Sequence, residues 1–248
     1  MQPGPNEIVQ CPSCGTFQRR RTLLSGNTLN AKYYSDGSRK APMLPSFPYF
    51  IKCPECSVFF KLSSEVIVKK VPWAPEPDEW TMDIGAEVWD TDLDDLEIVK
   101  HRKGKTAPKV KGADAPFVKF LDVKEYWQAI EIGLVNSGRK NSKTWKEDIL
   151  AMRILLWRTL NIRWQMDEEE KKIYDENCRA ILDAIIDKLD DENLITRAEV
   201  HRNLGEFDEC ASLLDKIKEP EKYEYYLSAI GKACKAGDTL TVCVQSNR

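Results

Sequence analysis

Four cysteines in the first quarter of the chain have the residue types and spacing of a metal site. Cys11 and Cys14 lie in the run Cys-Pro-Ser-Cys-Gly, and Cys53 and Cys56 lie in the run Cys-Pro-Glu-Cys. In each run a tight turn brings two sulfurs towards one ion. Two such turns that face each other supply four thiolates at the corners of a tetrahedron, which is the arrangement that zinc takes in closed structural sites. We therefore predict one structural Zn²⁺ ion bound by these four residues.

The alternatives to this zinc site are a pair of metal-free turns, a redox motif of the thioredoxin type, and an iron site. A redox motif needs one C-x-x-C pair, so it leaves the matched second pair unexplained. Iron, as a single ion or in an iron–sulfur cluster, would use the same four ligands, and the sequence leaves zinc and iron open. A shell of four sulfurs has no position for water or substrate, so we expect the site to be structural and not catalytic.

The other four cysteines have no ligand-like spacing; they are Cys178, Cys210, Cys234 and Cys243. They stand among apolar neighbours in helical patterns, so we expect them to be small buried hydrophobic residues. The first twenty-five residues contain no apolar run that could act as a signal-peptide core, and no stretch approaches the roughly 18 apolar residues that span a bilayer. These features favour a cytoplasmic protein with reduced thiols and no membrane segment.

The residues around the two cysteine pairs predict a small antiparallel sheet. Asp36-Gly37 is a two-residue hairpin signal, residues 47–51 lead directly into the second pair, and residues 58–62 would return from it as a strand. These features resemble a zinc ribbon, in which two knuckles cap the ends of a small sheet. Thirty-eight residues separate Cys14 from Cys53, about twice the roughly 15–20 of the simplest ribbons.

A second resemblance covers mainly residues 8–62. The phrases Ser25-Gly26-Asn27-Thr28, Tyr34-Ser35-Asp36-Gly37 and Ala41-Pro42-Met43-Leu44-Pro45 are similar to those of uncharacterised bacterial proteins with an N-terminal C-P-x-C-G zinc ribbon. Weaker echoes occur at Tyr126-Trp127 and at Leu156-Trp157. This resemblance implies a ribbon fold and implies no activity.

Residues 73–115 differ in composition from the segments on either side and predict a charged linker that contains proline and tryptophan. Residues 76–97 carry ten acidic and no basic side chains, whereas residues 100–111 carry six basic and no acidic ones. Acidic segments with interspersed tryptophans often dock on a partner. They can also pack their aromatic rings on their own domain, and we favour this second interpretation because three tryptophans are costly to leave in water.

From residue 116 onward apolar residues recur at helical spacing and predict a helical domain, residues 116–248. Helix starts are indicated at Asp122 with Glu125, at a capping box from Thr144 to Glu147, and at Asp167 with Glu170. Further helices are expected near 192–204 and 207–217 and after Pro220. Residues 239–245 alternate in the manner of a strand.

Part of this helical domain resembles a tetratricopeptide unit. The stretch from Ala198 through Gly205-Glu206-Phe207 to Cys210 has the small residues and the Gly-x-Phe turn of such helical pairs, with Cys210 where that family usually has Ala. One repeat cannot bury its own core, so the sequence leaves a tetratricopeptide-like array and a plain helical bundle open. The predicted fold class is α+β, with a small antiparallel zinc-ribbon module over residues 1–72 followed by the linker and the helical domain.

These features favour a non-enzymatic interaction or adaptor protein whose helical half binds a protein partner. The alternative is a nucleic-acid-binding adaptor, because residues 1–72 carry ten basic against four acidic side chains. Phosphate contacts would make such binding depend strongly on salt, and tyrosines could stack on bases. The candidate residues for this alternative are Arg19, Arg20, Arg21, Lys32, Tyr33, Tyr34, Arg39 and Lys40.

An enzyme is the third and least favoured hypothesis. The chain has two histidines, His101 in the basic run and His201 on a predicted helix face, and we expect His201 to be a partly buried helix residue. The sequence contains no nucleotide-binding loop, nucleophile elbow or open metal triad. We therefore predict no catalytic or cofactor-binding residue beyond the four metal ligands.

Overall fold

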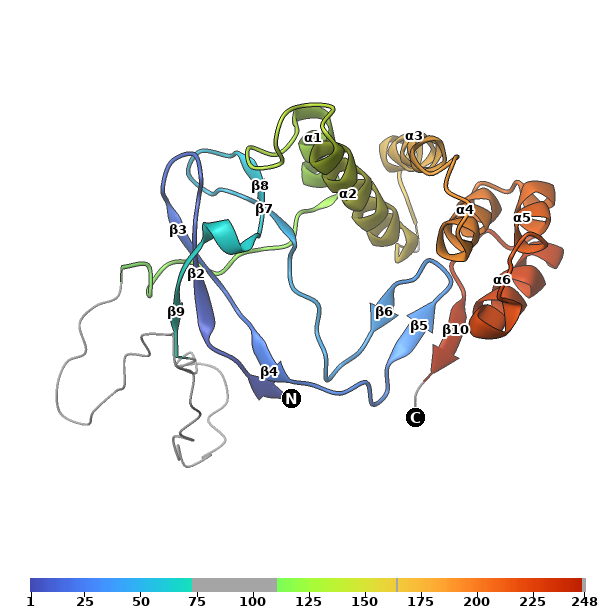
Figure 1. The fold of residues 1–248 in the computed structure, drawn as a ribbon, viewed down its shortest axis with the longest axis horizontal. Helices are drawn as coiled ribbons and strands as arrows, with labels where there is room; N and C mark the ends of the chain where they lie inside the picture. Colours follow the sequence, from blue (N-terminus) through green and yellow to red (C-terminus); the bar gives the residue numbers. More distant parts are fainter. Residues whose placement is uncertain (73–110, 164, 247–248) are drawn as a thin grey trace. The chain divides into compact units, whose positions relative to one another are not determined.

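The computed structural model describes residues 1–72, 111–163 and 165–246 (Figure 1). The acidic block, the interspersed tryptophans, His101 and nearly all of the predicted linker lie outside the described residues. The chain divides into two compact units. Unit 1 comprises residues 1–26 and 47–120, and unit 2 comprises residues 27–46 and 121–248. Small antiparallel sheets in the N-terminal part and helices in the C-terminal half confirm the predicted α+β class.

Unit 1 consists of short strands. They are β1 (Gln2–Pro3), β2 (Asn6–Gln10), β3 (Phe17–Arg20), β4 (Leu23–Ser25), β7 (Phe50–Lys52), β8 (Phe59–Lys61) and β9 (Ile67–Val71), with the 3-10 helix η1 (Ser64–Val66) before β9. Strand β2 is the middle strand of a sheet with the order β3-β2-β9, while β1 pairs with β4 and β7 pairs with β8. A parallel bridge joins Arg19 of β3 to Phe117, so the chain returns to this unit before the helices begin.

The apolar core of unit 1 includes the strands that lead into the two cysteine pairs. Val9 of β2, Ile51 of β7 and Phe60 of β8 are completely buried, and Cys11 and Cys53 belong to the same cluster. Full burial of each large apolar side chain contributes about 1.5–3 kcal/mol. The same packing that stabilises the unit therefore positions the first cysteine of each pair.

Unit 2 contains all the described α-helices and one small sheet. The helices are α1 (Val123–Ile132), α2 (Lys143–Asn161), α3 (Glu168–Ala184), α4 (Asp191–Asn203), α5 (Phe207–Leu214) and α6 (Glu224–Lys235), with the 3-10 helix η2 (Pro220–Tyr223) before α6. The sheet has the order β10-β5-β6 and is formed by β5 (Lys32–Tyr34), β6 (Arg39–Lys40) and β10 (Cys243–Ser246). In Figure 1 the red strand β10 lies beside β5, as their antiparallel pairing requires.

The hairpin β5–β6 groups with the helices, although in sequence it lies between the two cysteine pairs. The backbone N–H of Ser35, in its turn, donates to the carbonyl of Val242 at 2.9 Å. The sequence-based division places this hairpin with the ribbon and places residues 116–120 with the helices, and the contacts group both segments differently. The physical reason is that the long connection between Cys14 and Cys53 folds into a hairpin that pairs with the C-terminal strand.

The described helix starts agree with the sequence at Asp122 and Asp167. The carboxylate of each accepts a hydrogen bond at 2.8 Å from the backbone N–H three residues on, at Glu125 and at Glu170. The predicted capping box from Thr144 is wrong, because the N-cap of α2 is Ser142, two residues earlier, and the helix already begins at Lys143. Ser142 has an extended backbone, and its hydroxyl accepts a hydrogen bond from the N–H of Trp145 at 3.2 Å. It therefore provides the acceptor that an N–H group of the first helical turn needs.

Helices α4, α5 and α6 share one apolar cluster. Ala198 and Cys210, the small residues of the tetratricopeptide-like pattern, are completely buried within it together with Ile230. Cys178, Cys210 and Cys234 are buried as predicted, but Cys243 is exposed. The prediction fails at Cys243 because this residue begins the edge strand β10 and does not lie on a helix. Within the described ranges, no helix is long and apolar enough to cross a membrane.

Candidate metal centre

Each cysteine pair occupies the turn of a β-hairpin in unit 1. Cys11 directly follows β2, and Cys53 directly follows β7. The flanking strands pair across each turn, with Gln10 opposite Phe17 in the first hairpin and Lys52 opposite Phe59 in the second. The chain therefore builds the same knuckle twice.

The backbone of the two knuckles follows one plan. The N–H of Gly15 donates to the carbonyl of Cys11 at 3.0 Å, and the N–H of Ser57 donates to the carbonyl of Cys53 at 3.0 Å. Both donors have a left-handed backbone, with φ of 76° at Gly15 and 58° at Ser57. Glycine adopts this conformation freely, whereas a side chain raises its cost by about 1–2 kcal/mol. The conformation of Ser57 is thus imposed by the turn that presents Cys53 and Cys56.

The four sulfurs converge on one point. The Sγ atoms of Cys14 and Cys53 are 3.5 Å apart, those of Cys11 and Cys56 are 3.7 Å apart, and all four lie within 4.8 Å of one another. Thiolates bound at about 2.3 Å to one tetrahedral zinc ion lie roughly 3.8 Å from one another. A disulfide would bring two sulfurs to about 2.05 Å, so these cysteines are not cross-linked. The donor set and its spacing fit a single tetrahedral metal ion.

The protonation of the four sulfurs depends on their surroundings. Burial raises the pKa of Cys11 to about 12 and also raises the pKa of Cys53. At Cys14, which is exposed, a hydrogen bond with the Thr16 side chain lowers the pKa to about 6. Without a cation the buried thiols therefore keep their protons at neutral pH, and a bound metal ion has to displace them.

The residues predicted to bind nucleic acid are divided between the two units. Arg19, Arg20 and Arg21 lie in or next to β3 of unit 1, whereas the other candidates lie on the β5–β6 hairpin of unit 2. Arg20 also forms a 2.5 Å ion pair with Glu7, which occupies its guanidinium group. The predicted set is therefore not one continuous surface within either unit.

Unit 1 contains a cation–aromatic cluster that sequence reasoning missed. The guanidinium carbons of Arg19 and Arg21 lie 4.1 and 4.6 Å from the centroid of the Phe117 ring. The Nζ atom of Lys111 lies 5.4 Å from the centroid of Phe17. Phe117 approaches β3 from nearly a hundred residues away in the sequence, so no local pattern could indicate the contact.

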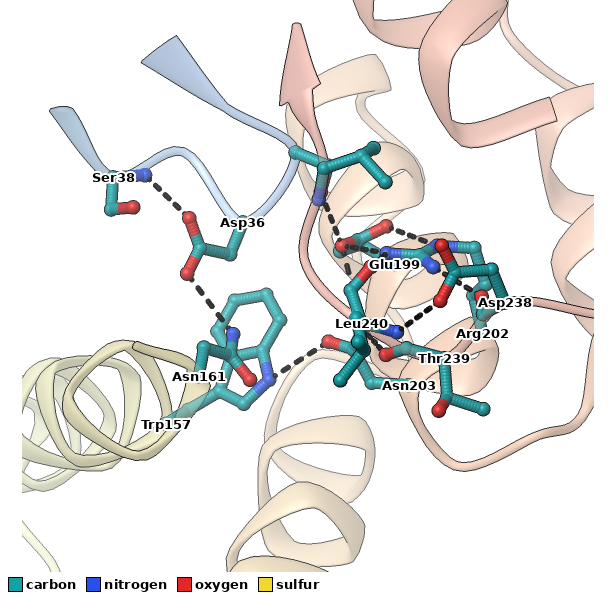
Figure 2. Close-up of polar contacts among 12 residues, drawn as sticks. Asp36, Ser38, Trp157, Asn161, Glu199, Arg202, Asn203, Asp238, Thr239 and Leu240 are labelled. Atoms are coloured by element: carbon teal, nitrogen blue, oxygen red, sulfur yellow. Dashed lines mark hydrogen bonds and ion pairs between the residues drawn. The ribbon is translucent and has the colours of Figure 1, made fainter. Parts of the chain in front are cut away.

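Unit 2 contains a buried polar network that connects α4 with the C-terminal segment (Figure 2). Glu199 and Arg202 have completely buried side chains and form an ion pair at 2.5 Å. Arg202 also donates to the carbonyl oxygens of Asp238 and Leu240, the latter at 2.9 Å. Burial is the largest single effect and would lower the pKa of Arg202, but its hydrogen bonds to Glu199 and the attraction of nearby negative charges, Glu199 first, together outweigh burial and raise the pKa. Arg202 therefore remains charged.

The same network anchors the β5–β6 turn. The hydroxyl of Ser35 donates to Glu199 at 2.6 Å. The carboxylate of Asp36 accepts from the side-chain amide of Asn161 at 3.0 Å, and its backbone carbonyl accepts from Nε of Arg158 at 3.0 Å. Figure 2 shows Asp36 and Asn161 facing each other between the turn and α2. These contacts attach the connection between the two cysteine pairs to the helices.

His201 takes part in polar contacts that join helices. It is partly buried on α4, and its Nδ1 atom lies 2.6 Å from a carboxylate oxygen of Glu206. The other oxygen of Glu206 pairs with Arg179 of α3. The group connects α4 with α3 and with the start of α5, in agreement with the partly buried helix residue expected from the sequence.

No protein-family model, no curated protein and no solved structure matches this chain. The four-cysteine cluster is consistent with the zinc-ribbon resemblance. The C-terminal half is helical, which is consistent with the tetratricopeptide resemblance.

Proposed function

We propose that this chain is a non-enzymatic zinc-binding adaptor that acts in the cytoplasm. A structural zinc ion stabilises the ribbon of unit 1, and the tetratricopeptide-like helices of unit 2 bind a protein partner. The single observation that carries the proposal is the convergence of four cysteine sulfurs within 4.8 Å. Four thiolates complete a tetrahedral shell, so the ion organises the fold and has no open position for a substrate.

The spacing of the sulfurs supports one ion in preference to a polynuclear cluster. An iron–sulfur cluster would have to place more than one iron, with bridging sulfides, among sulfurs that lie within 4.8 Å of one another. A single ion needs only the distances of 3.5 and 3.7 Å found between the closest sulfurs. Metal analysis together with visible absorbance separates zinc from a single iron ion.

The helical unit supports a binding role through its shared core. Leu194 of α4, Cys210 of α5 and Ile230 of α6 belong to one buried cluster, so consecutive helices stack on one another. Repeat proteins use stacks of this kind to present extended surfaces to protein partners.

The test is capture of the full-length protein from its native cells after chemical cross-linking, with and without nuclease. We expect a protein partner that survives nuclease and that binds the purified chain in a defined stoichiometry. Cys243→Ser is the control variant. It removes an exposed thiol outside the metal centre, so it should capture the same partner as the unsubstituted protein. Failure to reconstitute any captured protein with the purified chain would contradict the adaptor proposal.

Nucleic-acid binding is the second candidate function, and the cluster of Arg19, Arg21 and Phe117 favours it. Two guanidinium groups on one aromatic ring are chemically suited to phosphates and bases. A gel-shift titration in increasing salt tests this candidate. The logarithm of the binding constant should fall linearly with the logarithm of the salt concentration, with a slope of about −0.7 to −0.9 for each phosphate contacted. Arg21→Gln should weaken binding, whereas Arg197→Gln in unit 2 should leave it unchanged.

A further inference from the structure

Unit 2 contains a pocket of about 310 Å³ that includes none of the metal ligands. The turn of the β5–β6 hairpin, helices α2 and α4, and two tyrosines from η2 and α6 line it. This volume is at the lower end of the roughly 300–1,000 Å³ range of ligand pockets. The pocket therefore suits a small molecule.

Arg158 of α2 provides a positive charge at this pocket. Its Nε donates to the carbonyl of Asp36 at 3.0 Å, and within the described ranges no hydrogen bond or ion pair ends on its two terminal nitrogens. Asp36 does not fill this role, because its carboxylate oxygens accept from the N–H of Ser38 at 2.8 Å and from Asn161 at 3.0 Å. Burial lowers the pKa of Arg158, as expected where a guanidinium is only partly compensated. A planar carboxylate would satisfy both terminal nitrogens at once.

Glu192 of α4 provides a negative charge at the same pocket. It is exposed, and one of its oxygens accepts a long 3.4 Å hydrogen bond from the hydroxyl of Tyr223. The lining of the same pocket also includes the buried side chain of Ile195 and the aromatic rings of Tyr223 and Tyr226. These rings can contact an apolar body and can also attract a cation.

The charges of the lining select a ligand with two opposite charges. A simple anion would satisfy Arg158 but would be repelled by Glu192 and Asp36, and a simple cation would leave the terminal nitrogens of Arg158 without an acceptor. We propose that this pocket binds a small amino-acid-like zwitterion with an apolar side chain, whose carboxylate pairs with Arg158 and whose ammonium group pairs with Glu192. The proposal concerns unit 2 alone and does not depend on the metal ion or on a macromolecular partner.

The experiment titrates the full-length protein with three compounds that share one aromatic body: L-phenylalanine, N-acetyl-L-phenylalanine and L-phenylalaninamide. The readout is the indole N–H resonance of Trp157, which lines the pocket and donates to Asn203 at 3.2 Å. The resonance is assigned from its loss in Trp157→Phe. We expect L-phenylalanine to bind more tightly than either blocked analogue, because each analogue lacks one of the two charges.

Two variants assign the charges. Arg158→Gln should weaken L-phenylalanine at least about tenfold, since a desolvated charge-assisted pair is lost. Glu192→Gln should weaken L-phenylalanine and L-phenylalaninamide by about two- to fivefold, because its carboxylate is exposed, and should not weaken N-acetyl-L-phenylalanine. Arg153→Gln is the control, because it removes a guanidinium from the same helix at a position that does not line the pocket.

Three results would overturn the proposal. The first is no shift of the Trp157 resonance with millimolar L-phenylalanine. The second is equal or tighter binding of a blocked analogue, which would identify the occupant as a chain terminus or as a simple ion. The third is unchanged binding in a folded Arg158→Gln protein. The analogues are compared on the unsubstituted chain, so the proposal can still be refuted if a variant fails to fold.

Discussion

The buried pair of Glu199 and Arg202 offers a sharp test of how unit 2 is held together. Both side chains are completely buried, and Arg202 has partners on Glu199, Asp238 and Leu240. Arg202→Met retains most of the side-chain volume but removes the charge and its donors. Among the described residues, the variant leaves the buried Glu199 carboxylate with hydrogen bonds from Ser35 and Asn203 alone.

The expected loss is large because a buried charge is left without its counter-charge. Removing one partner of a buried ion pair typically costs about 3–5 kcal/mol. In a unit of this size each kcal/mol lowers the melting temperature by about 2–4 °C, so we expect a decrease of roughly 6–20 °C. Replacing both partners, as in Glu199→Gln with Arg202→Met, should cost less than Arg202→Met alone, because no isolated charge remains.

The deficit of Arg202→Met should also depend on pH. Burial raises the pKa of Glu199 even against the opposing effect of Arg202, and the variant lacks that opposition. A carboxyl whose folded pKa lies above its unfolded value favours folding in its protonated form. Its contribution is complete below about pH 4.3 and is lost as the pH rises through the folded pKa. The variant should therefore be less destabilised at pH 5 than at pH 8.

Thermal unfolding followed by far-ultraviolet circular dichroism measures these effects, because the described helices all lie in unit 2. The control is Arg197→Met on the same helix, whose guanidinium makes an exposed hydrogen bond to the carbonyl of Ile186. It should change stability by less than about 1 kcal/mol. The reasoning is refuted if Arg202→Met behaves like Arg197→Met at pH 8, or if the double variant is less stable than Arg202→Met.

Three further predictions concern the metal centre and the charged segment. Ser57→Gly should stabilise unit 1 by about 0.5–1 kcal/mol and Gly15→Ala should destabilise it, because both positions have a left-handed backbone. Calorimetry must show that the two substitutions change the free energy of unfolding in opposite directions. Acidification should release the metal, since protons compete for the thiolates of Cys11 and Cys53, and a chromogenic zinc indicator should show affinity rising with pH; a pH-independent affinity would contradict thiolate ligation. Deleting residues 76–97, which carry ten acidic side chains, should raise the affinity for DNA or RNA and steepen its salt dependence if unit 1 binds nucleic acid. If the deletion protein does not bind nucleic acid at low salt, nucleic-acid binding by unit 1 is excluded.

The metal centre could be predicted from sequence because its information is local. Each C-P-x-C run encodes one turn, and the match between the two runs indicates that they meet. The starts of α1 and α3 could likewise be predicted at Asp122 and Asp167, because an N-cap hydrogen bond joins residues three positions apart.

The polar network of unit 2 could not be predicted in this way. Its contacts join residues as far apart as Asp36 and Asn161, separated by 125 positions. Sequence alone assigned the hairpin around Asp36-Gly37 to the ribbon, because it lies between Cys14 and Cys53. Which unit a hairpin joins depends on the strand that pairs with it, and here that strand is β10, near the other end of the chain.

The central claim is one structural zinc ion held by four cysteines, and the most direct test is elemental analysis of the full-length protein purified without chelators. We predict about one zinc per chain, because four thiolates complete one tetrahedral shell. Cys53→Ser should lower this ratio and unfold unit 1, whereas Cys243→Ser, which removes an exposed cysteine outside the centre, should leave it unchanged. Purified protein with no bound metal, or with iron and its visible absorbance in place of zinc, would contradict the claim.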